Sequence, residues 1–222
     1  MKKEYWLIAF IILLIAHLAG IQLRNESIQF LTKPLLIPVV AGYFLSQTNS
    51  IASSLKKWIL LALFFSWGGD VLLMFVSKNE LYFLLGLASF LLAHIFYIVF
   101  FHNVRVRENI KSNPWFLVIV VVYYAALTSW LSPYLGEMKL PVRIYGIVIS
   151  IMFMLAMHVW AIKNKAAGKW MLFGALLFVV SDSVLAINKF YEPFDAAGII
   201  IMLTYGLAQL FIVKGAAEYI DH

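Results

Sequence analysis

The sequence predicts an all-α membrane protein, a bundle of about eight transmembrane helices that forms a single domain over residues 1–222. Hydrophobic residues make up 64% of the 222-residue chain and charged residues only 13%, against about 25% in a typical soluble domain. Apolar runs of about 20 residues, long enough to cross a bilayer, recur with short polar breaks between them. No break is long enough for a soluble domain, so we expect any chemistry to take place at or in the membrane.

The expected helices follow one another closely along the chain. The first, near residues 5–22, follows two lysines and has some features of a signal peptide. Its apolar run is long for that, and His17 interrupts the plausible cleavage region, so we interpret it as the first membrane helix. The other seven are expected near residues 28–45, 57–76, 80–101, 114–132, 140–162, 169–190 and 194–214.

The distribution of Lys and Arg predicts the orientation of the bundle. Basic residues concentrate in cytoplasmic loops, and the side of the N-terminus holds eleven of them against five on the other side, with Lys33 inside a helix. We therefore expect both termini in the cytoplasm, an even helix count, and a bacterial inner membrane protein with no nucleic-acid partner. The eleven are Lys2, Lys3, Lys56, Lys57, Arg105, Arg107, Lys111, Lys163, Lys165, Lys169 and Lys214, and the five are Arg24, Lys78, Lys139, Arg143 and Lys189.

Several kinds of site have no motif in this sequence. The chain has no cysteine, which excludes disulfides, thiolate nucleophiles and cysteine-ligated metals. It has no Gly-x-Ser-x-Gly elbow, no His-x-x-x-His pair, no P-loop and no Gly-rich dinucleotide turn. We therefore expect neither a metal nor a cofactor.

Three ionisable residues inside the expected helices share one depth. A charge at a helix centre costs roughly 2.5–3.5 kcal/mol on insertion scales, so its presence calls for a reason. Asp70 and Asp182 each lie 13 residues into an outward-running helix, which is roughly 20 Å from the cytoplasmic end at 1.5 Å per residue. Lys33 lies five residues into an inward-running helix, at a similar level. We expect the three to form a polar cluster in the bundle interior.

This cluster has a chemical and a purely structural interpretation. Two neighbouring carboxylates in a low-dielectric interior do not both ionise easily. One protonated and one ionised aspartate is the arrangement that acid–base catalysis uses. Alternatively, an Asp–Lys pair with hydrogen bonds between helices only holds the bundle together. Two aspartates at one depth favour the catalytic interpretation.

Other polar residues are candidates for support or for substrate binding. Ser66 shares a helix face with Asp70, and the hydroxyls of Ser181 and Ser183 either bind the carboxylate of Asp182 or satisfy backbone carbonyls, the commoner role. His94 is expected about 10 Å nearer the cytoplasm than the aspartates, either in a headgroup pocket or in a hydrogen bond between helices. Tyr205 and Gln209 share a face of the last helix.

A weak internal repeat relates the two halves of the chain. The segment Gly69-Asp70-Val71-Leu72-Leu73 is similar to Ser181-Asp182-Ser183-Val184-Leu185, and the two aspartates are 112 apart (182 − 70) in the sequence. His94 and Gln209, in similar Leu-Ala-x-x-Phe surroundings, are 115 apart (209 − 94). A four-helix unit repeated in parallel would give this pattern, although apolar helices also resemble one another by composition.

An ordered set of segments, spread over five of the eight expected helices, resembles the lysoplasmalogenase family, also called the YhhN family. This chain has Trp67 where the family usually has an aliphatic residue, and the loops and the fifth and sixth helices match only as hydrophobic segments. The matching segments are Thr32-Lys33-Pro34-Leu35, then residues 65–74 (FSWGGDVLLM), 85–97 (LGLASFLLAHIFY), 178–186 (FVVSDSVLA) and 204–212 (TYGLAQLFI).

The resemblance implies an eight-helix enzyme that hydrolyses the vinyl ether bond of lysoplasmalogens. Its substrate would be a lysophospholipid taken from the membrane, and its products a fatty aldehyde and glycerophosphoethanolamine or glycerophosphocholine. The two intramembrane aspartates of the family fall on Asp70 and Asp182. Lys33 would bind the phosphate or tune one aspartate.

Two other functions are compatible with the same residues. Intramembrane Asp, His and Lys in parallel repeats are also what a proton-coupled small-molecule or lipid transporter would need. A lipid-binding membrane protein without enzymatic activity is the third interpretation. Turnover would distinguish the enzyme from the other two.

Overall fold

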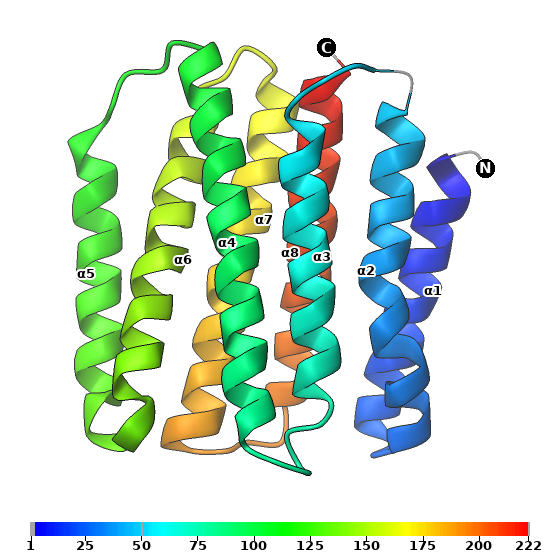
Figure 1. The fold of residues 1–222 in the computed structure, drawn as a ribbon, viewed down its shortest axis with the longest axis vertical. Coiled ribbons are helices and arrows are strands. Elements are labelled where there is room, and N and C mark those ends of the chain that lie inside the picture. Colours follow the sequence, from blue (N-terminus) through cyan, green and yellow to red (C-terminus); the bar gives the residue numbers. More distant parts are fainter. Residues whose placement is uncertain (1–2, 50, 222) are drawn as a thin grey trace.

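Long helices run side by side along the height of the protein, and both termini lie toward the same end (Figure 1). The structure is a computed structural model that describes residues 3–49 and 51–221. Within this part of the chain it contains eight α-helices and no strand, which confirms the expected fold class. Lys2, one of the basic residues counted for the orientation, lies outside the described residues.

The helix order agrees with the expected one, with some changes at the ends. Two short 3-10 turns join α5 to α6, and a π-helical turn over Ile187–Tyr191 continues α7. The helices are α1 Lys3–Gln22, α2 Glu26–Thr48, α3 Lys56–Leu73, α4 Leu81–Arg107, α5 Pro114–Leu131, α6 Lys139–Val159, α7 Lys165–Ala186 and α8 Ala197–Ile220.

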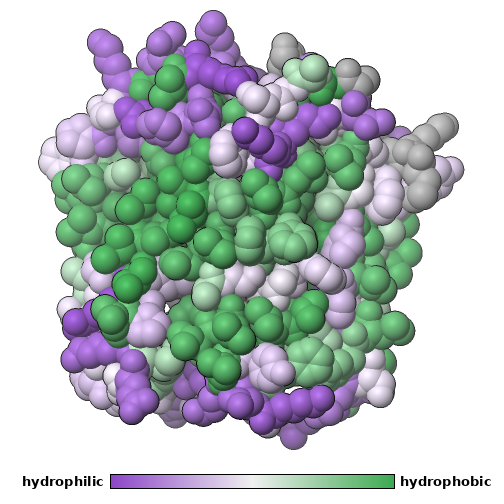
Figure 2. Space-filling model, viewed as in Figure 1, coloured by the Kyte–Doolittle hydropathy of each residue, from purple (hydrophilic) through white to green (hydrophobic). Residues whose placement is uncertain are grey.

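On the face shown in Figure 2, a mainly apolar band lies between two polar rims. Large apolar side chains point outward in this band, among them Ile12, Leu31 and Val122. Seven helices are long and apolar enough to cross a membrane, and the eighth, α3, is 18 residues long and carries Lys56, Lys57 and Asp70. An exposed apolar surface of this extent has lipid as its solvent, so this is an integral membrane protein.

The α4 helix, which was expected to end near Phe101, continues to Arg107. The polar residues after Phe101 remain helical because Asn103 donates a hydrogen bond to the carbonyl of Val99 and Val104 is fully buried. The helix ends where Asn109 adopts a left-handed conformation (φ 54°), a common way to stop a helix. Hydropathy alone did not show this extra turn and a half.

The ends of α7 and α8 also differ from the expected ones. The α7 helix begins at Lys165, four residues early, because the Asn164 side chain accepts a hydrogen bond from the Ala167 backbone nitrogen and caps it. The α8 helix continues to Ile220 because Gly215 packs closely against α7. A Cβ atom at Gly215 would lie 2.6 Å from the carbonyl oxygen of Ala167.

Two prolines lie inside α2, and each leaves one backbone carbonyl without its helical partner. Pro38 has no N–H to donate to the carbonyl of Pro34, and in lipid such a group needs another donor. The indole nitrogen of Trp67 on α3 supplies it, at 3.0 Å from that carbonyl oxygen. Trp67, which departs from the family pattern, therefore joins α3 to α2 next to Lys33.

The helix packing recurs in the two halves of the chain. In the first half α2 contacts α3 and α3 packs on α4, and in the second half α6 contacts α7 and α7 packs on α8. Between the halves, α4 packs on α6 as α8 packs on α2. In Figure 1, α1 and α5 lie at opposite edges of the bundle. Two parallel four-helix repeats produce this arrangement.

Candidate active site

Asp70 on α3 and Asp182 on α7 line one cavity in the interior of the bundle. Its volume is about 90 Å³, and the side chains of Lys33, Tyr145 and Tyr205 line it together with apolar residues. The Asp70 side chain is 3% exposed and that of Asp182 is 14% exposed. The structure thus brings together the three charged residues that the sequence placed at one depth.

Asp70 has a hydroxyl donor and a cation as partners. The Tyr205 hydroxyl on α8 donates a hydrogen bond to Oδ2 of Asp70 at 2.7 Å. The Lys33 ammonium group on α2 lies 4.0 Å from Oδ1. Three helices therefore hold this carboxyl group in place, and the nearby cation offsets part of the cost of a carboxylate in the membrane.

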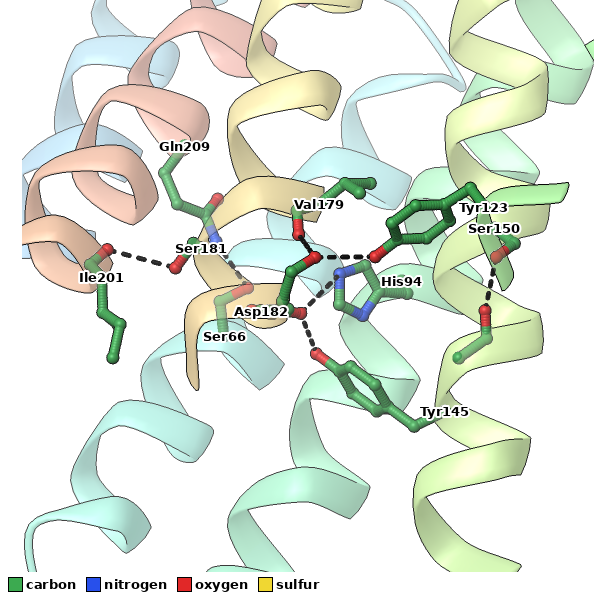
Figure 3. Close-up of polar contacts among 12 residues, drawn as sticks. Ser66, His94, Tyr123, Tyr145, Ser150, Val179, Ser181, Asp182, Ile201 and Gln209 are labelled. Carbon is green, nitrogen blue, oxygen red and sulfur yellow. Dashed lines mark hydrogen bonds and ion pairs between the residues drawn. The ribbon is translucent and has the colours of Figure 1, made fainter. Parts of the chain in front are cut away.

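Asp182 has a different pair of partners (Figure 3). The Tyr145 hydroxyl on α6 donates a hydrogen bond to Oδ2 at 2.5 Å, and Nε2 of His94 on α4 lies 3.9 Å from the same oxygen. Neither partner is a permanent cation. The two aspartates therefore differ in their electrostatic surroundings, although both are buried.

The partners of the two aspartates correspond through the internal repeat. Lys33 and Tyr145 are 112 apart (145 − 33) in the sequence, the same spacing as Asp70 and Asp182. Each reaches its aspartate from the second helix of the same half. The remaining partner of each aspartate comes from the fourth helix of the other half, Tyr205 for Asp70 and His94 for Asp182.

His94 lies deeper than expected. The prediction that it sits well to the cytoplasmic side of the aspartates is wrong, because α4 extends to Arg107 and the helix end is correspondingly farther from His94. Its ring is fully buried and packs edge-on against Tyr145 and Phe178, with ring centroids 5.2 and 4.6 Å away. Neither ring nitrogen has a hydrogen-bond partner among the described residues. The Nε2 atom faces the carboxyl group of Asp182 (Figure 3).

In the described part of the chain, the remaining candidates make no hydrogen bond to the aspartates. Gln209 donates to the hydroxyl of Ser66 at 2.9 Å and accepts from the hydroxyl of Tyr97 at 2.5 Å, which links α8 to α3 and α4. Ser181 donates to the carbonyl of Ile201, and Ser183 donates to that of Val179. The serines on either side of Asp182 thus satisfy backbone carbonyls, the commoner of the two roles considered.

Tyr145 is the partner that sequence reasoning missed. Tyrosines are frequent near the ends of membrane helices, and nothing in the local sequence marks this one. The repeat could have found it, because the spacing between the two aspartates, applied to Lys33, leads to residue 145. Tyr123, also missed, donates to the Ser183 hydroxyl at 2.7 Å on the far side of Asp182.

The chemistry available here is that of two carboxyl groups, their hydroxyl donors and one cation. Such a site can donate and accept protons and can stabilise a positive charge that develops on a substrate. Within the part of the chain that the structure describes, no group of three or more His, Asp or Glu side chains is arranged to hold a metal ion.

The comparisons with known proteins agree on one family. The YhhN family profile matches residues 28–216. A lysoplasmalogenase of Mycobacterium bovis is 29% identical over 72% of this chain and 60% of its own length. Two human lysoplasmalogenases are 33% identical (59% of this chain, 52% of theirs) and 30% identical (72% of this chain, 65% of theirs). This chain thus spans between about half and two thirds of the length of these relatives. No solved structure matches it. Because the family profile covers most of the chain, including Asp70 and Asp182, the chain belongs to the YhhN family.

Proposed function

We propose that this chain is a membrane-embedded hydrolase that cleaves the vinyl ether bond of lysoplasmalogens. The products are a fatty aldehyde and glycerophosphoethanolamine or glycerophosphocholine. The observation that carries the proposal is the cavity between Asp70 and Asp182, where two buried carboxyl groups face a common space within the membrane-spanning bundle. The names of the relatives support a lysoplasmalogen as the substrate.

Vinyl ether hydrolysis needs a proton donor and a base, which two aspartates provide. A carboxylic acid transfers its proton to the β-carbon of the vinyl ether, and an oxocarbenium ion forms. Water adds to this cation and gives its proton to the carboxylate, as in the two-carboxylate chemistry of glycosidases. The hemiacetal so formed then collapses to the aldehyde and the free hydroxyl of the glycerol. During this collapse Asp70 gives its proton to the departing glycerol oxygen and Asp182 takes the proton of the hemiacetal hydroxyl, so one water is consumed and both carboxyl groups regain their starting states.

The surroundings of the two aspartates support a different role for each. Asp70 serves as the carboxylate, because the Lys33 ammonium group lies 4.0 Å from it and stabilises a negative charge. Asp182 serves as the acid, because its partners Tyr145 and His94 carry no permanent charge. Tyr205 and Tyr145 orient the two carboxyl groups, and the contacts of Ser66, Gln209, Ser181 and Ser183 fix the helices that bear them.

The orientation of the protein follows from its basic residues. The loops and helix ends at the end with both termini hold most of the Lys and Arg residues, which supports a cytoplasmic location for that end. The proposed location is the bacterial inner membrane, with the aspartate cavity inside the bilayer. Fusion of a reporter that is active only in the cytoplasm to the C-terminus tests this orientation.

Aldehyde release from lysoplasmenylethanolamine by the purified protein tests the proposed activity. The matched substrate is the saturated 1-O-alkyl analogue, which has the same headgroup and chain length but no vinyl ether to protonate. We expect aldehyde from the first substrate only. A folded protein that releases no aldehyde contradicts the proposal, and proton-dependent uptake into vesicles would then support a transporter, which the names of the relatives do not favour.

A further inference from the structure

A second, larger cavity opens next to the aspartate cavity, at the end of the bundle opposite the termini. Its volume is about 490 Å³, and it lies between α1, α2, α8 and the end of α3. Four residues line both cavities, namely Lys33, Leu73, Ile201 and Met202. The two spaces are therefore neighbours, with the Lys33 ammonium group at their boundary.

The polar residues of this outer cavity form a charged row that leads to Lys33. Glu26, Gln29 and Lys33 follow one another at spacings of three and four residues, so they lie on one face of α2. Lys78 and Ser77, in the turn after α3, line the same cavity. The cavity is thus lined by two ammonium groups, a hydroxyl and a carboxylate, together with the imidazole of His17.

The side of Asp182 that faces away from this cavity is mostly apolar, and the hydroxyl groups of Tyr123 and Ser183 on that side are bonded to each other. There Asp182 and Tyr145 border a narrow slot between α5, α6 and α7, which Leu127, Leu131 and Ile149 line. A charged headgroup has no counter-ion in such surroundings, whereas a hydrocarbon chain fits them. At the other end of the bundle, the cavity around Arg107 and Lys163 shares no lining residue with the aspartate cavity among the described residues.

We propose that the outer cavity binds the phosphoethanolamine headgroup of the lysolipid, with the phosphate at Lys33 and Lys78 and the ammonium group at Glu26. This inference rests on the proposed function and adds the direction in which the substrate lies. A glycerol backbone separates the phosphate from the vinyl ether, so a phosphate at Lys33 places the vinyl ether beside Asp70. The alkenyl chain then leaves toward the slot between α5, α6 and α7, and the substrate enters from the face opposite the termini.

Kinetics of Lys78→Met on two substrates test the phosphate site. Lys78 is exposed in a turn, so its loss leaves the fold intact, and Lys163→Met at the other end of the bundle is the matched control. We expect KM for lysoplasmenylethanolamine to rise about tenfold in Lys78→Met, the effect of one charge-assisted contact. KM for 1-alkenylglycerol, which has no phosphate, should stay unchanged, and Lys163→Met should behave as the wild type. An equal change on both substrates, or an effect of Lys163→Met alone, overturns the proposal.

Glu26→Gln tests the ammonium site. It should raise KM for the ethanolamine substrate severalfold and leave KM for the 1-alkenylglycerol phosphate unchanged, since that substrate has no amine. The same increase for both substrates would show that Glu26 does not recognise the amine.

Binding of a lipid that cannot be cleaved tests the headgroup site without relying on the proposed activity. The 1-O-alkyl lysophosphoethanolamine should raise the Tm of the wild type and of Lys163→Met in detergent, and this shift should be much smaller in Lys78→Met. That result supports the headgroup site even if no vinyl ether is hydrolysed. Equal shifts in all three proteins overturn the proposal. So does an equal shift with inorganic phosphate, which would indicate a simple anion site.

Discussion

Asp70 and Asp182 occupy equivalent positions in the two halves of the bundle, yet only Asp70 has a lysine beside it. Lys33 approaches Asp70 from α2, and its counterpart in the second half, Tyr145, approaches Asp182 from α6. A repeat with identical partners would give two carboxyl groups of the same character. The replacement of a cation by a neutral hydroxyl in one half makes the two sides of the cavity chemically different, and acid–base catalysis needs such a difference.

The first prediction concerns the two carboxyl groups. Asp70→Asn and Asp182→Asn keep the shape of each side chain but can neither release nor accept a proton, so each should lower kcat by about 100-fold to 10,000-fold. Aldehyde release measures the rate, and the Tm in detergent checks that the protein is folded. Asp195→Asn, in the exposed loop before α8, is the matched control and should retain full activity. A nearly normal rate in either site variant would remove that aspartate from the mechanism.

Much of this site could be predicted from the sequence, because charge inside a lipid-facing helix is rare. The shared depth of Lys33, Asp70 and Asp182 followed from the helix starts and the rise per residue, and the contact between Lys33 and Asp70 confirms it for that pair. The depth of His94 was predicted wrongly, because it was counted from the expected end of α4. The helix extends further because Val104 is buried, and it ends where Asn109 adopts a left-handed conformation. Hydropathy locates the centre of a membrane helix better than its ends.

The hydroxyl partners were harder to predict than the charges. Tyr205 was a candidate because it shares a helix face with Gln209, whereas Tyr145 was one of the chain's 11 tyrosines. Both donate to an aspartate, but which of many tyrosines does so depends on the rotation of each helix. Packing sets that rotation, and the hydropathy of a helix that is apolar all round does not reveal it.

The second prediction concerns these hydroxyl groups. Tyr145→Phe and Tyr205→Phe each remove one hydrogen bond to a buried carboxyl group and leave the ring in place, so each should lower kcat about tenfold. KM should change little, because neither hydroxyl lines the outer cavity. Tyr124→Phe is the control, since its hydroxyl makes only a long contact of 3.4 Å with the carbonyl of Arg143. Equal losses in all three variants would indicate a general effect on the bundle.

The third prediction is a bell-shaped dependence of kcat/KM on pH. Activity falls as the pH is lowered because the base, Asp70, becomes protonated, and it falls as the pH is raised because the acid, Asp182, loses its proton. His94→Phe should lower the rate and leave both limbs in place, because His94 packs beside Asp182 and does not line the aspartate cavity. Loss of one whole limb in His94→Phe would instead make the imidazole the acid or the base.

The fourth prediction concerns the packing that holds Asp182 in place. At Gly174 the α7 and α8 backbones are so close that a Cβ atom would lie 2.6 Å from the backbone nitrogen of Ile212 and 2.8 Å from the carbonyl oxygen of Ala208. Small residues allow membrane helices this approach, and backbone atoms cannot move aside as a side chain can. Gly174→Ala should therefore destabilise the protein by about 1–3 kcal/mol.

A lower Tm in detergent measures this loss, and Gly198→Ala is the control. At Gly198, near the start of α8, the nearest atom to an added Cβ is a terminal methyl group of Ile21 at 3.2 Å, which can rotate away. Gly174→Ala should also lower kcat, because a separation of α7 from α8 moves Asp182 relative to Tyr205 and the Asp70 that Tyr205 binds. If Gly174→Ala had the Tm and the rate of the wild type, the close contact of α7 and α8 would not be what positions the two aspartates.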